Sequence, residues 1–158
     1  MKKILFLMVM TVLGLQQTFA QASKLTQAEL KFRNQIEQFL KEEGFVPTID
    51  NDDNSLNWKK EGDNYWLTVS GSLPTYVQIN KSGFTLKDSN RLLMLEACND
   101  NNLNKRCGKA TATDTSVLIT VEFYCYDIES FRVSFYDNIR ALDSAKKHVK
   151  DYYNEHDK

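Results

Sequence analysis

The residues best suited to chemistry are the oxygen-rich run 50–54, Asp-Asn-Asp-Asp-Asn, and Glu61. Counted from Asp50, oxygen-bearing side chains stand at positions one, three, five and twelve, which is the ligand spacing of a calcium-binding EF-hand loop. Ser55, however, occupies the position where the sharp turn needs glycine, and Pro47 interrupts the helix that should precede such a loop. We therefore expect a solvated turn before a hairpin rather than a metal site.

Histidine supplies the next candidates, because a catalytic triad or a zinc site would have to use His148 or His156. Neither has a cysteine or an acidic motif at zinc-ligand spacing. Ser144 lies one helical turn before His148, but an exposed helical serine has no oxyanion donors nearby. We expect no catalytic residue, no cofactor and no metal, and interpret the chain as a non-enzyme, with an undetected hydrolase as the least favoured alternative.

The N-terminal segment indicates export. Lys2 and Lys3 precede an apolar run over residues 4–15, and small residues follow at Ala20 and Ala22. A positive start, a short hydrophobic stretch and a small-x-small exit are typical of a secretory signal peptide, which we assign to residues 1–20. This run is too short to span a bilayer, and no later run approaches the needed length. We therefore expect a soluble periplasmic or secreted protein without a membrane span.

The rest of the chain is interpreted as one domain, residues 24–156. The full sequence has 158 residues, a formal net charge of −1 and 11% aromatic residues. Near-neutral, unpatterned charge argues against binding to nucleic acid.

Apolar spacing of three and four residues predicts helices over 26–43, 89–99 and 131–152. Thr26 and Glu29 form a capping box for the first helix, Gly44 is its stop signal, and Asp88 can cap the second. Alternating patterns predict strands over 56–58, 65–69, 75–80, 107–113 and 117–126. The expected fold is α+β: an antiparallel five-stranded sheet with helices, in the order α-β-β-β-α-β-β-α.

The strand over 117–126 places Cys125 on one face, with Tyr124 and Tyr126 on the other. Helices can cover only part of such a sheet, and tyrosine is enriched at protein interfaces. We predict Tyr124 and Tyr126 as interface residues; the alternative is that they lie under the last helix.

The three cysteines suggest one bridge and one spare thiol. If Thr113 and Ser116 flank the last hairpin turn, residue 110 pairs with 119 and 112 with 117, which directs Cys125 into the core and Cys107 to the other face. We therefore predict a Cys98–Cys107 disulfide, closing the loop over 99–106, and a free Cys125. Such a loop closure would stabilise the fold by about 2–3 kcal/mol.

The order and spacing of several segments resemble a known family. They are FLKEEGF at 39–45, LLMLEA at 92–97, and the asparagine-rich stretch NDNNLN at 99–104 followed by Gly108-Lys109-Ala110. The chain resembles the YbjN-like, type III secretion chaperone-like domains over nearly its whole mature length. The resemblance implies a protein-binding or regulatory domain that often dimerises and has no known catalysis. The signal peptide and the Cys98/Cys107 pair depart from the cytosolic members.

These observations favour an exported, non-catalytic domain that binds a protein partner or itself. The alternative is a small-molecule-binding domain with a pocket between sheet and helices, lined by Trp58, Trp66 and Tyr76.

Overall fold

A computed structural model describes residues 25–85 and 91–157. Three helices are described: α2 (Gln27–Glu42), α3 (Arg91–Asn104) and α4 (Ile128–His156). The strands are β1 (Thr48–Ile49), β2 (Leu56–Lys60), β3 (Asp63–Ser70), β4 (Thr75–Thr85), β5 (Lys109–Ala112) and β6 (Ser116–Cys125). The predicted signal peptide, residues 1–20, and the predicted cap Asp88 lie outside the described residues.

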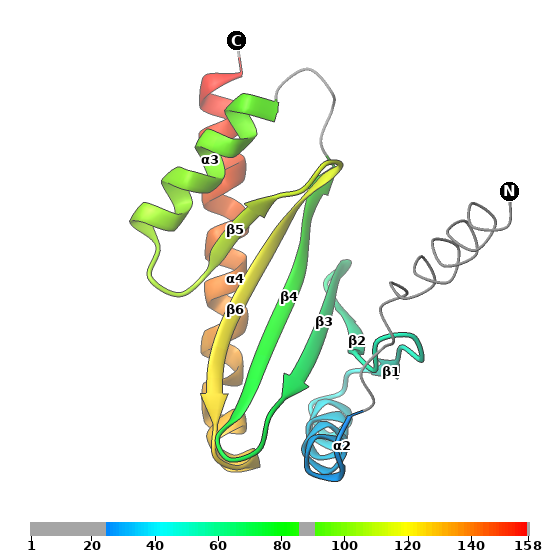
Figure 1. The fold of residues 1–158 in the computed structure, drawn as a ribbon. Helices are drawn as coiled ribbons and strands as arrows, with labels where there is room; N and C mark the ends of the chain where they lie inside the picture. Colours follow the sequence, from blue (N-terminus) through cyan, green and yellow to red (C-terminus); the bar gives the residue numbers. More distant parts are fainter. Residues whose placement is uncertain (1–24, 86–90, 158) are drawn as a thin grey trace, which may run out of the picture.

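The strands form one antiparallel sheet in the order β1-β2-β3-β4-β6-β5 (Figure 1). The long helix α4 runs along the sheet and contacts β4, β5 and β6. Helix α2 packs near the beginning of α4, while α3 packs near its end and beside β5. The α+β class and the antiparallel sheet are therefore confirmed.

Local signals fix the ends of the helices. The Thr26 side chain accepts a hydrogen bond from the Glu29 backbone, and the Glu29 carboxylate accepts one from the Thr26 backbone, so the predicted capping box is present. Gly44 follows α2 with a φ of +86°, a left-handed conformation that glycine adopts without strain. Asp127 caps α4 by accepting a hydrogen bond from the Ser130 backbone.

The expected strand count of five is wrong for the described residues, which form six strands in the order α-β-β-β-β-α-β-β-α. The additional strand, β1, pairs Thr48 with Asn57 and Ile49 with Leu56. Two residues are too few to show an alternating pattern, and Pro47 beside the acidic turn suggested a loop.

Strand β4 also extends beyond the strand predicted over 75–80, because the chain stays extended through Ser82 and Gly83. The pairing of β4 with β6 instead shifts between Ser82 and Thr85, which is a bulge inside the strand. A Cβ atom at Gly83 would lie 2.6 Å from the Val117 carbonyl oxygen, so glycine permits this close approach.

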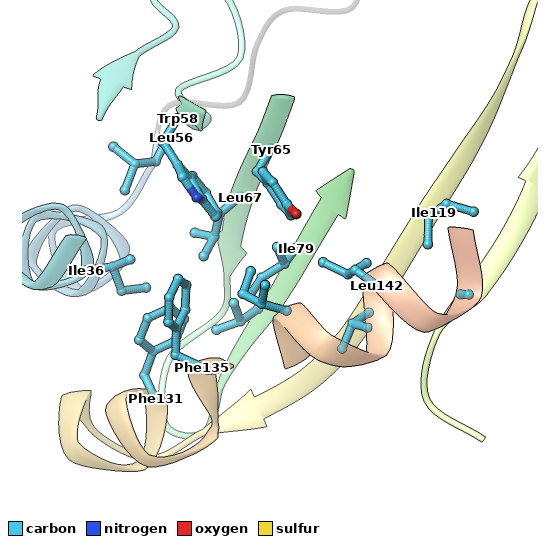
Figure 2. Packing of buried hydrophobic residues seen from close by; sticks show 14 of the residues in the cluster. Ile36, Leu56, Trp58, Tyr65, Leu67, Ile79, Ile119, Phe131, Phe135 and Leu142 are labelled. Carbon is cyan, nitrogen blue, oxygen red and sulfur yellow. The ribbon is translucent and has the colours of Figure 1, made fainter. Parts of the chain in front are cut away.

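One continuous hydrophobic core lies between the sheet and the helices (Figure 2). Phe131 and Phe135 of α4 meet Phe39 of α2 edge to face, at ring-centroid distances of 5.7 and 5.2 Å. Every other residue of β3 and β6 enters this core. The opposite side chains form the second face of the sheet, which is called the open face below.

Helix α3 continues through the asparagine-rich stretch that looked like a loop. Its amide side chains replace the strand that β5 lacks on its outer edge: Asn102 accepts a hydrogen bond from the Ala110 N–H at 2.8 Å and donates one to the Ala110 carbonyl at 2.9 Å. Asn101 donates to the Gly108 carbonyl at 3.0 Å. These bonds explain why asparagines and a Gly-Lys-Ala segment occur together.

The predicted Cys98–Cys107 disulfide is not present, since all three cysteines are free thiols. The reason is the length of α3: Cys98 lies inside the helix and is buried, whereas Cys107 is exposed beyond its end. Cys125 is free and buried as expected. The hairpin register is confirmed, because Ala110 pairs with Ile119 and Ala112 with Val117.

Candidate functional site

The predicted interface tyrosines both lie on the surface: Tyr124 is near the end of β6 on the open face, and Tyr126 follows the end of β6 beside α2. Tyr124 is 67% exposed and Tyr126 69% exposed, so neither is covered by α4. Tyr124 pairs across the sheet with Tyr76, and their rings contact edge to face at a centroid distance of 5.6 Å.

Leu73 extends this surface. It is 74% exposed and lines, together with Tyr126, a hollow of about 340 Å³ beside α2. We call Leu73, Tyr76, Tyr124 and Tyr126 the tyrosine patch.

The three aromatic residues expected to line one pocket between sheet and helices do not come together. Trp58 is buried in the core, where it stacks on Tyr65. Trp66 and Tyr76 point to the open face, and Tyr76 belongs to its far end. Trp58 and Trp66 do border a common hollow of about 510 Å³ at the β2–β3 hairpin.

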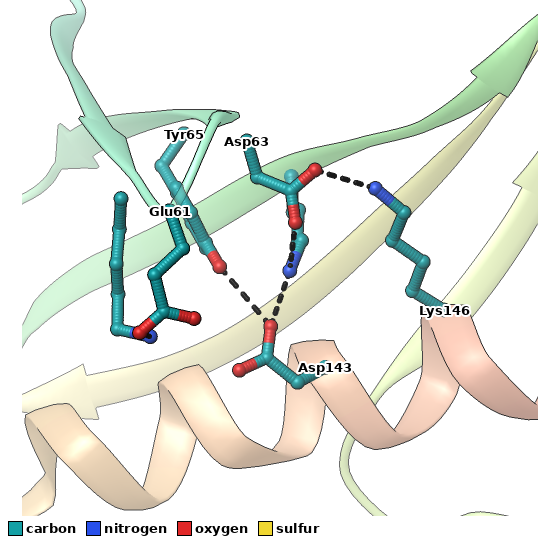
Figure 3. A network of polar contacts seen from close by, with 7 residues as sticks. Glu61, Asp63, Tyr65, Asp143 and Lys146 are labelled. Carbon is teal, nitrogen blue, oxygen red and sulfur yellow. Dashed lines mark hydrogen bonds and ion pairs between the residues drawn. The ribbon is translucent and has the colours of Figure 1, made fainter.

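The best-defined polar cluster lies between the sheet and α4 (Figure 3). Lys81, at the core side of β4, is only 4% exposed and forms ion pairs with Asp63 at 2.7 Å and with Asp143 of α4. The Tyr65 hydroxyl donates to Asp143 at 3.1 Å, and Lys146 pairs with Asp63 at 2.6 Å. We call these five residues the Lys81 cluster.

Hydrogen bonds, neighbouring charges and burial keep Lys81 and Tyr65 protonated and Asp63 ionised near neutral pH. Burial alone would lower the pKa of Lys81, but hydrogen bonds to Asp143 and Asp63 outweigh it and raise the pKa above its usual range. Burial would raise the pKa of Asp63, yet Lys146 and Lys81 hold it below its ordinary value. Burial raises the pKa of Tyr65 to about 12.

A lysine and a tyrosine that keep their protons are poor bases and poor nucleophiles at neutral pH. The cluster instead links β3, β4 and α4 through charge-assisted hydrogen bonds. The cluster therefore stabilises the packing of α4 against β3 and β4.

The position of Lys81 on the core face of β4 has a signal in the sequence. Val77 and Ile79 alternate into the core, and Lys81 continues the same period. The predicted strand ends at residue 80 and therefore leaves Lys81 out of the predicted core.

The acidic run forms the expected turn before a hairpin. Asp50 and Asp53 each accept a hydrogen bond at 2.8 Å from a backbone N–H two residues further on. Glu61 lies in the separate β2–β3 turn, where it and Gly62 have φ values of +52° and +85°. Among residues 25–85 and 91–157, no group of three metal-binding side chains is found.

The two histidines make contacts within and between helices. His148 of α4 contacts the Asp100 carboxylate of α3 at 2.6 Å, which ties the two helices together. His156 contacts the Tyr152 carbonyl one turn earlier at 2.8 Å. Neither histidine is paired with a serine or a cysteine among the described contacts.

The described residues form an α+β domain: an antiparallel sheet that packs its core face against helices, with exposed tyrosines at one end. Residues 33–157 match the YbjN family, described as "Putative bacterial sensory transduction regulator". The chain belongs to the YbjN family. A comparison with curated proteins finds none that matches it. In the part of the chain that the structure describes, no helix is long and apolar enough to cross a membrane.

Proposed function

We propose that this protein is a non-catalytic binding module that contacts another protein chain, a second copy included, through the tyrosine patch. The observation that carries the proposal is the exposure of Tyr124, on the open face at the end of β6, and of Tyr126 just beyond it. Tyrosine buries a large apolar area while its hydroxyl keeps a polar contact, so it is enriched at protein interfaces. Membership of a family described as regulatory agrees with such a role.

The Lys81 cluster supports the non-catalytic part of the proposal. Its lysine and tyrosine hold their protons at neutral pH, and its carboxylates are engaged by those same groups. The charged groups of the cluster therefore neutralise one another, and no substrate is needed to account for their presence.

The binding proposal is tested with the double variant Tyr124→Ser/Tyr126→Ser and the control Val133→Ser, which removes an exposed apolar side chain from α4. Sedimentation equilibrium reports self-association, and cross-linking followed by mass spectrometry reports a second protein. We expect the double variant to lose the association and the control to keep it. Association that is equal in both variants would refute the proposal, as would a strictly monomeric wild type without a cross-linked partner.

Export is proposed from the pattern over residues 1–20. Cell fractionation followed by N-terminal sequencing tests it directly. We expect a mature chain that begins at residue 21 in the periplasm or the medium, whereas an intact Met1 on a cytosolic protein would contradict export.

A further inference from the structure

A single row of side chains crosses the open face from one edge of the sheet to the other. Its members are aligned by strand register, each opposite the next: Thr48, Asn57, Trp66, Asn80, Thr120 and Lys109. All are polar except for the indole ring of Trp66. Asn80 and Thr120 are buried and bonded to each other, the Thr120 hydroxyl donating to the Asn80 carbonyl oxygen at 3.0 Å. Trp66 therefore has a polar side chain on each neighbouring strand, Asn57 on β2 and Asn80 on β4, and Asn80 is held by its bond to Thr120.

Two hollows open on either side of Trp66, and both include Trp66 and Ser82 in their walls. The larger, about 510 Å³, reaches Asn57 and Asn64 on the hairpin side. The smaller, about 350 Å³, lies above the β4 bulge. The hydroxyl-bearing residues Thr85, Thr113 and Ser116 border it, and the last two bond each other through their hydroxyls at 3.0 Å. Its wall also carries the apolar side chains of Phe84, Val117 and Leu118. The two hollows adjoin at Trp66 and Ser82, and we call them together the trough.

The polar groups of the trough are almost all neutral. Among residues 25–85 and 91–157, Lys59 is the only charged residue that lines either hollow. At the end of the cross-strand row, Lys109 is paired with Glu122 at 2.9 Å, which neutralises both. Among the described residues, a phosphate or another strongly anionic ligand would meet a single cationic side chain, Lys59, in this trough. The walls suit a ligand that is uncharged and rich in hydrogen-bonding groups.

A sugar has that chemistry. One face of a pyranose ring presents polarised C–H groups, and the face of an indole ring carries negative charge density, so the two surfaces attract each other. The hydroxyls around the sugar ring both donate and accept hydrogen bonds, as do the Asn57 and Asn64 amides.

We propose that the trough is a binding site for neutral oligosaccharides, with one sugar ring on Trp66 and a second in the hydroxyl-lined hollow. Ordered apolar walls with a few convergent polar groups are the usual composition of small-molecule sites. This site goes beyond the protein-binding proposal and does not depend on it. Tyr76 of the tyrosine patch lies four residues along β4 from Asn80 of the Trp66 row.

The test is a titration of the full chain with maltotetraose, cellotetraose and chitotetraose, followed by isothermal calorimetry and tryptophan fluorescence. The variant Trp58→Phe leaves Trp66 as the remaining tryptophan, so that its fluorescence reports the trough alone. We expect at least one sugar to bind saturably at millimolar concentrations or below and to change that fluorescence. Absence of binding by all three sugars would overturn the proposal.

Two variants locate the site. Trp66→Ala should weaken binding more than tenfold, and Asn64→Ala, which changes an exposed side chain and so leaves folding intact, should weaken it several-fold. Tyr124→Ser/Tyr126→Ser should retain sugar binding even where protein association is lost. Sugar binding that survives both trough variants would overturn the assignment, as would stronger binding of the acidic polymer polygalacturonate than of any neutral probe.

Discussion

The Lys81 cluster predicts an asymmetry between removing its cation and removing its anions. In the double variant Asp63→Asn/Asp143→Asn, the Lys81 ammonium stays in a site that is 4% exposed and loses both counterions. Leaving a buried charge unpaired costs 3–5 kcal/mol of stability as a rule. Because the two carboxylates are themselves 32% and 41% exposed, water can partly reach this edge of the site. We expect a loss of about 3 kcal/mol.

The converse variant, Lys81→Met, should be far milder. Methionine keeps most of the side-chain volume and removes the cost of burying an ammonium group. Asp63 retains its ion pair with Lys146, and Asp143 still accepts the hydrogen bond of Tyr65. We expect a loss of about 1 kcal/mol or less.

Urea unfolding at pH 7 measures both variants, with the midpoint shift interpreted at constant m-value. The matched control is Asp114→Asn/Asp137→Asn, which removes the same charge from two exposed ion pairs with arginines and should change stability by less than about 0.5 kcal/mol. The reasoning is refuted if Lys81→Met is as damaging as the carboxylate double variant, or if the control is.

The pH dependence of the Asp63→Asn penalty follows from the lowered pKa of Asp63. A carboxylate whose folded pKa is depressed stabilises the fold at pH values above its unfolded pKa, ordinarily 3.8, and loses that contribution as the pH falls through its folded pKa. The difference between the wild type and Asp63→Asn should therefore be full at pH 6–7 and shrink below about pH 4. A difference that grows towards acid pH would contradict this account.

Three further predictions concern α3 and the cysteines. Asn102→Ala removes both hydrogen bonds to Ala110 and should cost about 1–3 kcal/mol in urea unfolding, whereas Asn99→Ala, an exposed change in the same helix, should cost nothing measurable. Gly108→Ala would place a Cβ atom 2.6 Å from the Ala141 carbonyl oxygen of α4. We expect the free energy of unfolding to fall by about 1–3 kcal/mol, which lowers the thermal midpoint. A variant as stable as the wild type would disprove the close approach to α4. In the native protein, Ellman's reagent should modify the exposed Cys107 rapidly and spare the other two thiols, because burial raises the pKa of Cys98 and of Cys125 to about 11. After unfolding, all three thiols should react. A single reactive thiol in unfolded, unreduced protein would instead reveal a disulfide bridge.

The parts of the fold that were predictable from sequence are those set by local chemistry. The Thr26/Glu29 capping box and the Gly44 stop determine α2 within one turn of chain, and both are present. Strand pairing in the last hairpin followed from alternation and turn length, so the Ala110–Ile119 register was correct. These features need no information from distant residues.

The errors arose where a distant contact overrides the local preference. Asparagine favours loops, but Asn101 and Asn102 lie in α3 because their amides bond the β5 segment, and this extension of the helix removed the predicted disulfide. The strand predicted over 75–80 stops short of Lys81, yet β4 continues and Lys81 is buried, because Asp63 and Asp143 come from other elements to pair with it. For the tyrosine patch the residue type was informative, whereas exposure depended on where α4 lies.

The amide of Asn102 has a consequence for how this sheet can meet other molecules. Growth of a sheet by one more strand requires a row of free backbone N–H and C=O groups along an edge. At the β5 edge a side chain of the same molecule already occupies the groups of Ala110, and the other edge of the described sheet ends in β1, only two residues long and preceded by Pro47. Edge-to-edge polymerisation is therefore disfavoured at both sides. Association with other molecules must then use side chains on the faces of the sheet and on the helices. A single substitution there can abolish one contact without exposing a sheet edge that could grow into a fibre.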